Sequence, residues 1–260
     1  MKPILYAVDN HIATITLNTP QNLNAFNETM IHAVIDALAD AEQDEDVKVI
    51  VLAAAGRAFS GGGDIAEMIE GAKKDIVVFD KTVGPISEIS RNIKKSKKPV
   101  IASVFGAVAG AAFNIALACD FCIAADNAKF IQAFVNIALI PDAGGLFLLS
   151  RAVGVNKAMH LAMLGTPVTA AEGLDYGFVY NICAPDELEA ETQKLAERLV
   201  KGPSRSYAFM KELVYESQFK DYDTYTALEC EKQLACGYTE DFKEGVFAFG
   251  EKRKPVFTGK

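Results

Sequence analysis

Hydrophobic runs divide the N-terminal half of the chain into short strands separated by helices. Continuous apolar runs are typical of strands that are buried on both faces of a sheet. Such runs occupy residues 47–53, 100–104 and 121–124. Residues 5–8 and 12–17 predict two further short strands joined by a turn. The pattern therefore predicts a buried sheet built from segments scattered over the first half of the chain.

The helices are indicated by periodic apolar positions and by capping residues. Asn27 is suited to cap a helix whose apolar stripe begins at Met30. Residues 76–95 predict a second helix and the small residues 109–118 a third. Beyond residue 125 the pattern is mostly helical, with start or stop signals at Asn156, Gly165, Thr169 with Glu172, Asp186 with Glu189, Pro203 and Thr239.

Strands and helices that alternate in this way favour an α/β fold with one core domain. The helical C-terminal part is too long to be a minor extension of the core domain and too small to fold alone. A helical piece of this kind often packs on a neighbouring subunit, so we expect an oligomer.

Composition and charge narrow the class of partner. Half of the 260 residues are hydrophobic and the formal net charge is −8. This is globular composition, and an acidic balance argues against nucleic acid or an anionic membrane as the main partner. A local basic patch or a helix N-terminus can still hold a phosphate group.

The cysteines and the termini point to a reducing compartment. Five cysteines, an odd number, do not suggest a disulfide framework, and the pair Cys119 and Cys122 is better explained by a buried strand than by a zinc site. The N-terminus shows no signal-peptide stretch, and the uncharged residues 99–119 divide into a strand and a helix. We therefore expect a cytoplasmic protein without a membrane segment.

Three segments carry residues suited to chemistry. Residues 57–65 contain three consecutive glycines, which let backbone N–H groups approach a ligand, although a tight turn alone explains them. Residues 104–114 lead from a strand into a helix through small residues, which exposes free amides at a helix N-terminus or permits close packing. In residues 139–145, Asp142 lies in an apolar stretch, where it is either functional or an N-cap.

Together these segments resemble the crotonase superfamily, the enoyl-CoA hydratase/isomerase family. The resemblance spans nearly the whole chain, and its strength lies in the order and spacing of motifs that are individually weak. The matching motifs are Asn18-Thr19-Pro20, Asn24-Ala25-Phe26, the Gly61 to Gly63 loop, Lys98-Pro99-Val100-Ile101-Ala102, Ala118-Cys119-Asp120, Pro141-Asp142-Ala143-Gly144-Gly145 and the tail from Thr239 to Phe257.

The resemblance implies a crotonase-like spiral core of repeated ββα turns over residues 1–200. It implies a helical region over residues 201–260 that assembles trimers, which usually pair into hexamers. Its oxyanion hole would be the backbone N–H groups of Gly63 and Ala111. The resemblance implies no metal and no cofactor, because coenzyme A belongs to the acyl-CoA substrate. The substrate contacts it implies are Ala25, Phe26, Gly62, Asp64, Ile65, Asn114 and Phe134.

The sequence departs from the typical hydratase at two positions. Where hydratases of the family use two glutamates to handle water, this chain has Asn114 and Phe134, and neither titrates near neutral pH. Asp142 falls where some isomerases of the family place a catalytic aspartate. The motifs are most similar to those of the ring-epoxide phenylacetyl-CoA isomerase type.

Three functions follow as hypotheses. The first is an acyl-CoA isomerase in which Gly63 and Ala111 stabilise an enolate and Asp142 moves the proton. The second is an enoyl-CoA hydratase in which Asp142 positions water. The third is a CoA-binding family member without chemistry. The sequence does not define the acyl group.

Overall fold

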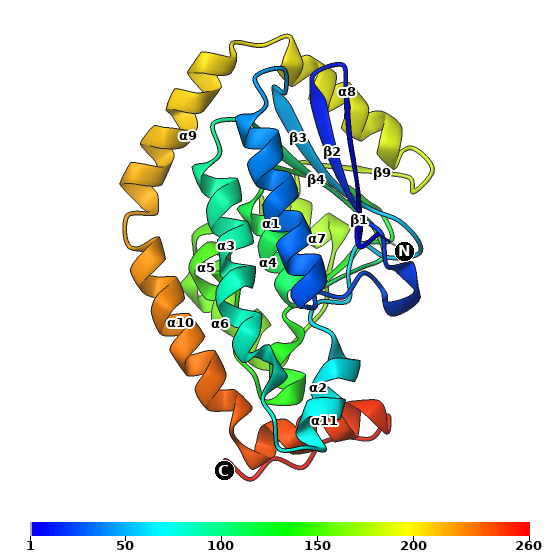
Figure 1. The fold of residues 1–260 in the computed structure, drawn as a ribbon, viewed down its shortest axis with the longest axis vertical. Helices are drawn as coiled ribbons and strands as arrows, with labels where there is room; N and C mark the ends of the chain where they lie inside the picture. The colour runs from blue at the N-terminus through cyan, green and yellow to red at the C-terminus, as the bar shows by residue number, and fades with distance from the viewer. Residues whose placement is uncertain (1) are drawn as a thin grey trace.

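The computed structural model describes residues 2–260 as an α/β protein with two sheets and a long helical C-terminal part (Figure 1). The strands are β1 (Ile4–Asp9), β2 (Ile12–Leu17), β3 (Val49–Ala54), β4 (Val100–Val104), β5 (Ala107–Ala109), β6 (Phe121–Ala125), β7 (Lys129–Ile131), β8 (Val168–Thr169) and β9 (Asn181–Cys183). The α-helices are α1 (Glu28–Gln43), α2 (Ile65–Ala72), α3 (Val83–Lys95), α4 (Ala111–Ala118), α5 (Gly145–Val153), α6 (Val155–Leu164), α7 (Ala170–Asp175), α8 (Leu188–Val200), α9 (Ser204–Gln218), α10 (Tyr222–Gly237) and α11 (Glu240–Gly250). Three 3₁₀ helices are η1 (Pro20–Asn22), η2 (Val78–Lys81) and η3 (Ala133–Ile137).

The main sheet has the strand order β1-β2-β3-β4-β6-β9. Only the β1–β2 pair is antiparallel, and the remaining pairs are parallel. The smaller sheet has the order β5-β7-β8. The predicted α/β class is confirmed.

The central strands are buried on both faces, as their continuous apolar runs predict. On β3, Ile50 and Leu52 pack in the cluster that contains residues of α1 and α3, whereas Val49 and Val51 pack in the cluster that contains residues of α8. Figure 1 shows α1 and α3 side by side over one face of the sheet. Helices therefore remove water from both faces, which is the arrangement that a parallel sheet requires.

Several predicted boundaries are confirmed and others are wrong. The side chains of Asn27 and Thr239 cap α1 and α11, and Thr169 forms the predicted capping box with Glu172. Asn156 does not cap α6, because Gly154 is the N-cap and Asn156 lies inside the helix. The predicted box at Asp186 and Glu189 is absent, because α8 begins after Glu187, which makes no side-chain cap. The predicted helix over residues 76–95 is divided into η2 and α3, and β5 was not predicted.

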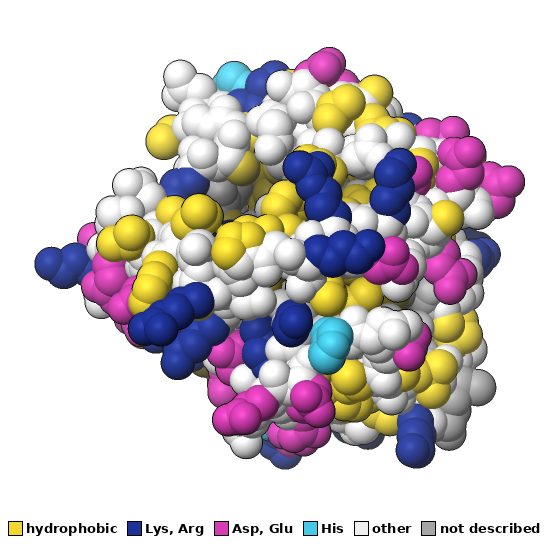
Figure 2. Space-filling view, turned by 90° about the horizontal axis from the view of Figure 1, so that it is seen from above, with side chains coloured by type: hydrophobic (Ala, Val, Ile, Leu, Met, Phe, Trp, Pro, Cys, Tyr) yellow, Lys and Arg dark blue, Asp and Glu magenta, His cyan; other side chains and the backbone are white. Residues whose placement is uncertain are grey.

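The C-terminal helices run along one side of the molecule and around its lower end (Figure 1). None of the residues of α9 is buried, and its large hydrophobic side chains Phe209, Met210, Leu213 and Val214 are more than half exposed. Seen from the end where α8 and α9 meet, the surface carries basic and hydrophobic side chains close together (Figure 2). The prediction that residues 201–260 assemble a trimer stays a prediction.

No helix within residues 2–260 combines the length and the apolar character needed to cross a membrane.

Candidate active site

A cleft lies between the loop after β3, the start of α4, η3 and helices α2, α3, α10 and α11. Its wall includes Gly63, Ala111 and Asp142, which come from three separate parts of the chain. The rest of the wall is mostly apolar, with Phe26, Ile31, Ile65, Met68, Phe79, Val83, Ile86, Phe134, Ile137, Leu139 and Phe249. An apolar pocket in which a few polar groups converge is the usual form of a small-molecule site.

The glycine loop is held rigidly by buried hydrogen bonds. The Asn24 side-chain amide donates to the carbonyl groups of Ala55, Ala58 and Phe59, and the Ser60 hydroxyl donates to the carbonyl of Asn24. Gly62 has a φ of +91°, and a Cβ atom there would lie 2.8 Å from the carbonyl oxygen of Ala109. Only glycine allows the loop to approach the segment before α4 this closely.

This close approach brings two backbone N–H groups to one cavity. Gly63 follows the loop, and Ala111 is the first residue of α4, where an N–H has no partner within the helix. Neither N–H donates a hydrogen bond to another atom of residues 2–260. Two unpaired amides in an apolar cleft, one of them at a helix N-terminus, are suited to an oxyanion.

Asp142 is the carboxylate that faces this cleft. Burial raises its pKa to about 7, although the Gln233 amide, which donates to Oδ2 at 3.4 Å, acts in the opposite direction. Its other oxygen, Oδ1, is buried and has no hydrogen-bond partner among the described residues. Asp142 does not cap a helix, because α5 begins at Gly145 with Gly144 as its N-cap and without a side-chain cap. The alternative explanation of Asp142 as an N-cap is therefore wrong.

The two positions that replace the hydratase glutamates differ in their placement. Phe134 lines the cleft and its ring lies near Gly110. Asn114 is fully buried behind the wall, where its amide donates to the carbonyl of Asp142 at 2.8 Å and its oxygen accepts from Gln132 at 2.7 Å. Asn114 therefore does not line the cleft, and it supports the backbone of Asp142.

Of the other predicted substrate contacts, some line the cleft and others do not. Phe26 and Ile65 line the cleft. Ala25, Gly62 and Asp64 are not among its lining residues; the Asp64 carboxylate instead caps α2 through the N–H groups of Ala66 and Glu67. Metal-binding clusters of three or more His, Cys, Asp or Glu residues do not occur in the described part of the chain.

Two residues of α10 were missed by the sequence analysis. Gln233 lines the cleft, and Glu229, one turn earlier, is only 4% exposed and accepts a hydrogen bond from the Gly144 N–H at 2.8 Å. Their i, i+4 spacing puts both on one face of the helix. That spacing is the sequence feature from which the two residues could have been identified, but polar residues on a C-terminal helix ordinarily indicate a solvated face.

We expect Gly144→Ala to destabilise the protein by about 2–4 kcal/mol, because both its conformation and its surroundings exclude a side chain. Its φ is +76°, and a Cβ atom would overlap the Tyr222 hydroxyl. Gly154→Ala is a strain-only comparison, since no atom lies within 4 Å of the added Cβ and its φ of +80° with a ψ of 154° is at least as unfavourable for alanine as the αL conformation of Gly144. The free energy of unfolding of both variants is measured in urea. A loss in Gly144→Ala of no more than about 1 kcal/mol, which the αL conformation alone explains, would contradict the expected clash with Tyr222.

Comparisons with known proteins show the family and the fold of the chain. The model of the enoyl-CoA hydratase/isomerase family matches residues 7–260. The chain therefore belongs to this family, and its fold is the crotonase fold.

Individual relatives include both isomerases and hydratases. The chain is 47% identical over 260 residues to a trans-2-decenoyl-[acyl-carrier-protein] isomerase of Streptococcus mutans, which covers 100% of this chain and 99% of the relative. It is 35% identical to a 1,2-epoxyphenylacetyl-CoA isomerase of Escherichia coli, with both chains covered completely. A crystal structure of an enoyl-CoA hydratase from Mycobacterium avium subsp. paratuberculosis superposes with a TM-score of 0.89 at 34% identity and covers 98% of each chain.

Proposed function

We propose that this protein is an isomerase that moves the double bond of a 2-enoyl thioester to the neighbouring position, with Asp142 as the single proton carrier. The observation that carries this proposal is one carboxyl group in the wall of a cleft that also holds two unpaired backbone N–H groups. A hydratase of the usual family type needs two acids facing its substrate, and Phe134 occupies one of those positions.

The reaction follows from these three groups. In its ionised form Asp142 takes a proton from C4 of the 2-enoyl thioester. The C–H electrons form the C3=C4 bond, and the π electrons of the former C2=C3 bond move to the bond between C2 and the thioester carbon. The negative charge is thereby delocalised onto the thioester oxygen. The N–H groups of Gly63 and Ala111 hold that oxygen, each contributing about 3 kcal/mol. Asp142 then returns the proton to C2, so no water is consumed or released.

The pKa of Asp142 suits this shuttle. A group with a pKa of about 7 accepts and donates a proton with similar ease near neutral pH. The reaction should therefore accelerate as the pH rises through about 7, because only ionised Asp142 can accept the first proton.

One relative supports an acyl carrier protein as the carrier and about ten carbons as the acyl length. These features come from the name of the Streptococcus mutans relative, which is 47% identical over the whole chain. The apolar wall of the cleft suits an apolar acyl group. A thioester of coenzyme A is the alternative substrate, because coenzyme A carries the same phosphopantetheine arm.

Basic residues that follow α11 are candidates for contact with the carrier. Phe249 of α11 lines the cleft, and Lys252 and Lys254 follow it. No ion pair involves either lysine within residues 2–260, whereas Arg253 is paired with Glu244 and Glu251. We therefore propose Lys252 and Lys254, but not Arg253, as contacts for phosphate or for an acidic carrier.

The test is a product assay in deuterated water with trans-2-decenoyl thioesters of acyl carrier protein and of coenzyme A. We expect a 3-enoyl product without the mass of water, in which C2 carries mainly the hydrogen taken from C4, because a single carrier returns the same proton before it exchanges with solvent. A product that has gained water would make the protein a hydratase. Turnover of an aromatic epoxide alone would favour a different candidate function, isomerisation of a ring epoxide. The 35% identity to the 1,2-epoxyphenylacetyl-CoA isomerase supports this candidate.

A further inference from the structure

The loop that carries Asp142 is held on both sides by one face of α10. The Gln233 side-chain oxygen accepts from the Ile140 N–H at 2.9 Å, and the Glu229 Oε1 accepts from the Gly144 N–H at 2.8 Å. Gln233 also donates to Asp142 Oδ2. Two residues one helical turn apart therefore grip the backbone two residues before and two residues after Asp142.

Each of the two carboxyl groups in this arrangement has one unsatisfied oxygen. Asp142 Oδ1 and Glu229 Oε2 are buried and have no hydrogen-bond partner among the described residues. A buried carboxylate oxygen without a donor is costly, and the negative charge of Asp142 acts on Glu229, so the two carboxyl groups do not both ionise readily in a dry site. One proton held by the pair removes both difficulties.

The groups that surround Glu229 do not neutralise a second charge. On α10 itself, Tyr222, Tyr225 and Cys230 lie near Glu229, and all three are uncharged at neutral pH. From α3, Arg91 is occupied by an ion pair with Asp223 and a hydrogen bond to Thr226. The loop itself brings only the acidic Asp142.

We propose that Glu229 is a positioning residue that works as an uncharged acid: it holds the loop through Gly144, shares the single proton of the pair with Asp142, and stops catalysis when it ionises. This inference rests on the proposed function, in which Asp142 is the base. Neutral Glu229 supplies the donor that the carboxylate of Asp142 lacks. Ionised Glu229 places a second negative charge beside the site where the dienolate must form.

The ionisation falls within an accessible pH range. Burial raises the pKa of Glu229 to about 8; the negative charge of Asp142 acts in the same direction, while the N–H groups of Gly144 and Gly145 and the Tyr225 hydroxyl oppose it. Activity should therefore rise as Asp142 ionises and fall again when Glu229 loses its proton. The two apparent pKa values belong to the pair rather than to either residue alone.

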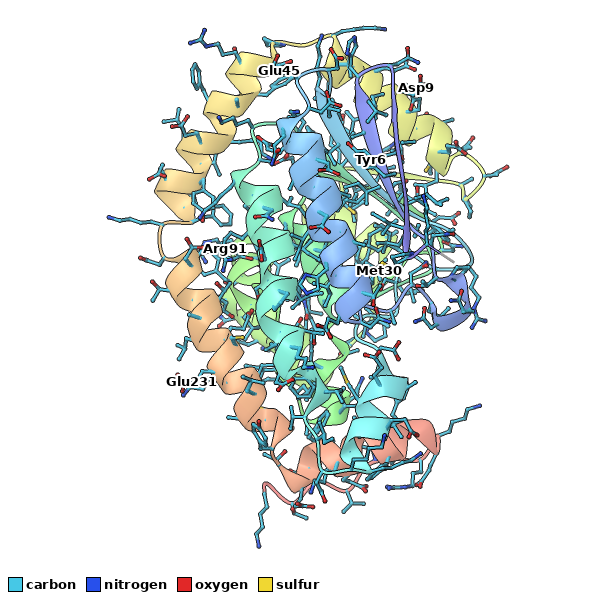
Figure 3. The ribbon with its side chains drawn as sticks, viewed as in Figure 1. Tyr6, Asp9, Met30, Glu45, Arg91 and Glu231 are labelled. Carbon is cyan, nitrogen blue, oxygen red and sulfur yellow. The ribbon has the colours of Figure 1, made fainter. Side chains whose placement is uncertain are left out.

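The test is the pH dependence of kcat/KM in Glu229→Gln. Glutamine keeps an oxygen for the Gly144 N–H and a donor for Asp142, but it does not ionise. We expect the ratio of kcat/KM at pH 9 to that at pH 7 to be about ten-fold higher in this variant than in the wild type. Glu231→Gln is the matched control, because Glu231 is exposed on the same helix and pairs with Lys232 (Figure 3). A Glu229→Gln profile that superimposes on the wild-type profile overturns the proposal.

A second measurement does not depend on turnover, and its decisive result comes from the wild-type protein. Protein labelled with ¹³C at glutamate carboxyl groups is titrated by NMR. We expect one glutamate signal in the wild type that titrates above neutral pH and is missing from Glu229→Gln, and its absence from the wild type overturns the proposal. If this signal is found but no variant isomerises an enoyl thioester, the proposed function fails while the shared proton stands.

A comparison of alanine and glutamine at residue 229 separates a positioning role from simple structural support. Glu229→Ala removes both the grip on Gly144 and the donor, so we expect a lower kcat than in Glu229→Gln at every pH. Equal kcat values for the alanine and glutamine variants at pH 7 would contradict a role for the hydrogen bonds of residue 229.

Discussion

Asp142→Asn should lower kcat for isomerisation by about 10³-fold, because the only carboxyl group that residues 2–260 place in the wall of the cleft is replaced by an amide that cannot accept a proton. The amide has nearly the same shape as the carboxyl group. One of its atoms can still meet Gln233, and the backbone contact to Asn114 is unchanged. The loss should therefore fall on kcat, while binding of a saturated acyl thioester is retained.

The measurement combines steady-state kinetics with calorimetry of a non-reactive decanoyl thioester. Asp126→Asn is the matched control, because Asp126 is exposed, lies after β6 and is not among the residues that line the cleft. Undiminished turnover in Asp142→Asn would exclude Asp142 as the base and return attention to Glu229. Loss of binding together with loss of turnover would indicate a collapsed loop rather than a missing base.

Ala111→Pro should lower kcat by about 10²–10³-fold, because proline removes the one N–H group that Ala111 contributes to the cleft. The substitution suits this position in other respects. Ala111 is the first residue of α4, and proline is tolerated at the first position of a helix, where the missing N–H has no intrahelical partner. The residue before it is glycine, which limits the strain that a following proline imposes.

The control is Ala111→Gly, which changes the side chain and keeps the N–H. We expect it to retain most of the turnover that Ala111→Pro loses. The stability of both variants is followed by thermal unfolding, so that a folding defect is recognised. A proline variant that is folded and fully active would show that the thioester oxygen is held elsewhere.

Much of the fold was predictable from local patterns. The apolar runs of β3, β4 and β6 were predictable because strands covered on both faces carry no polar alternation. The caps at Asn27, Thr169 and Thr239 were predictable because each side chain binds an N–H two or three residues away. The association of Gly63, Ala111 and Asp142 in one site came from the order of family motifs rather than from any local rule.

The misassigned caps show where local rules stop. Asn156 has the chemistry of an N-cap, but the helix is opened two positions earlier, at Gly154, whose φ of +80° separates α5 from α6. Asp186 and Glu189 have the spacing of a capping box, but the chain enters α8 through Glu187 without a side-chain cap. In both cases the residue that opens the helix is not the one whose side chain is best suited to cap it.

The sequence by itself determined the α/β class, the buried strands, several helix starts and the three segments that carry the proposed chemistry. Only the tertiary structure placed Asn114 behind Asp142 and Glu229 beside the Gly144 N–H. The second of these contacts joins residues 85 positions apart. The physical reason is that a carboxylate on a helix appears solvated in the sequence, whereas its burial and its pKa depend on which loop the fold packs against that helix.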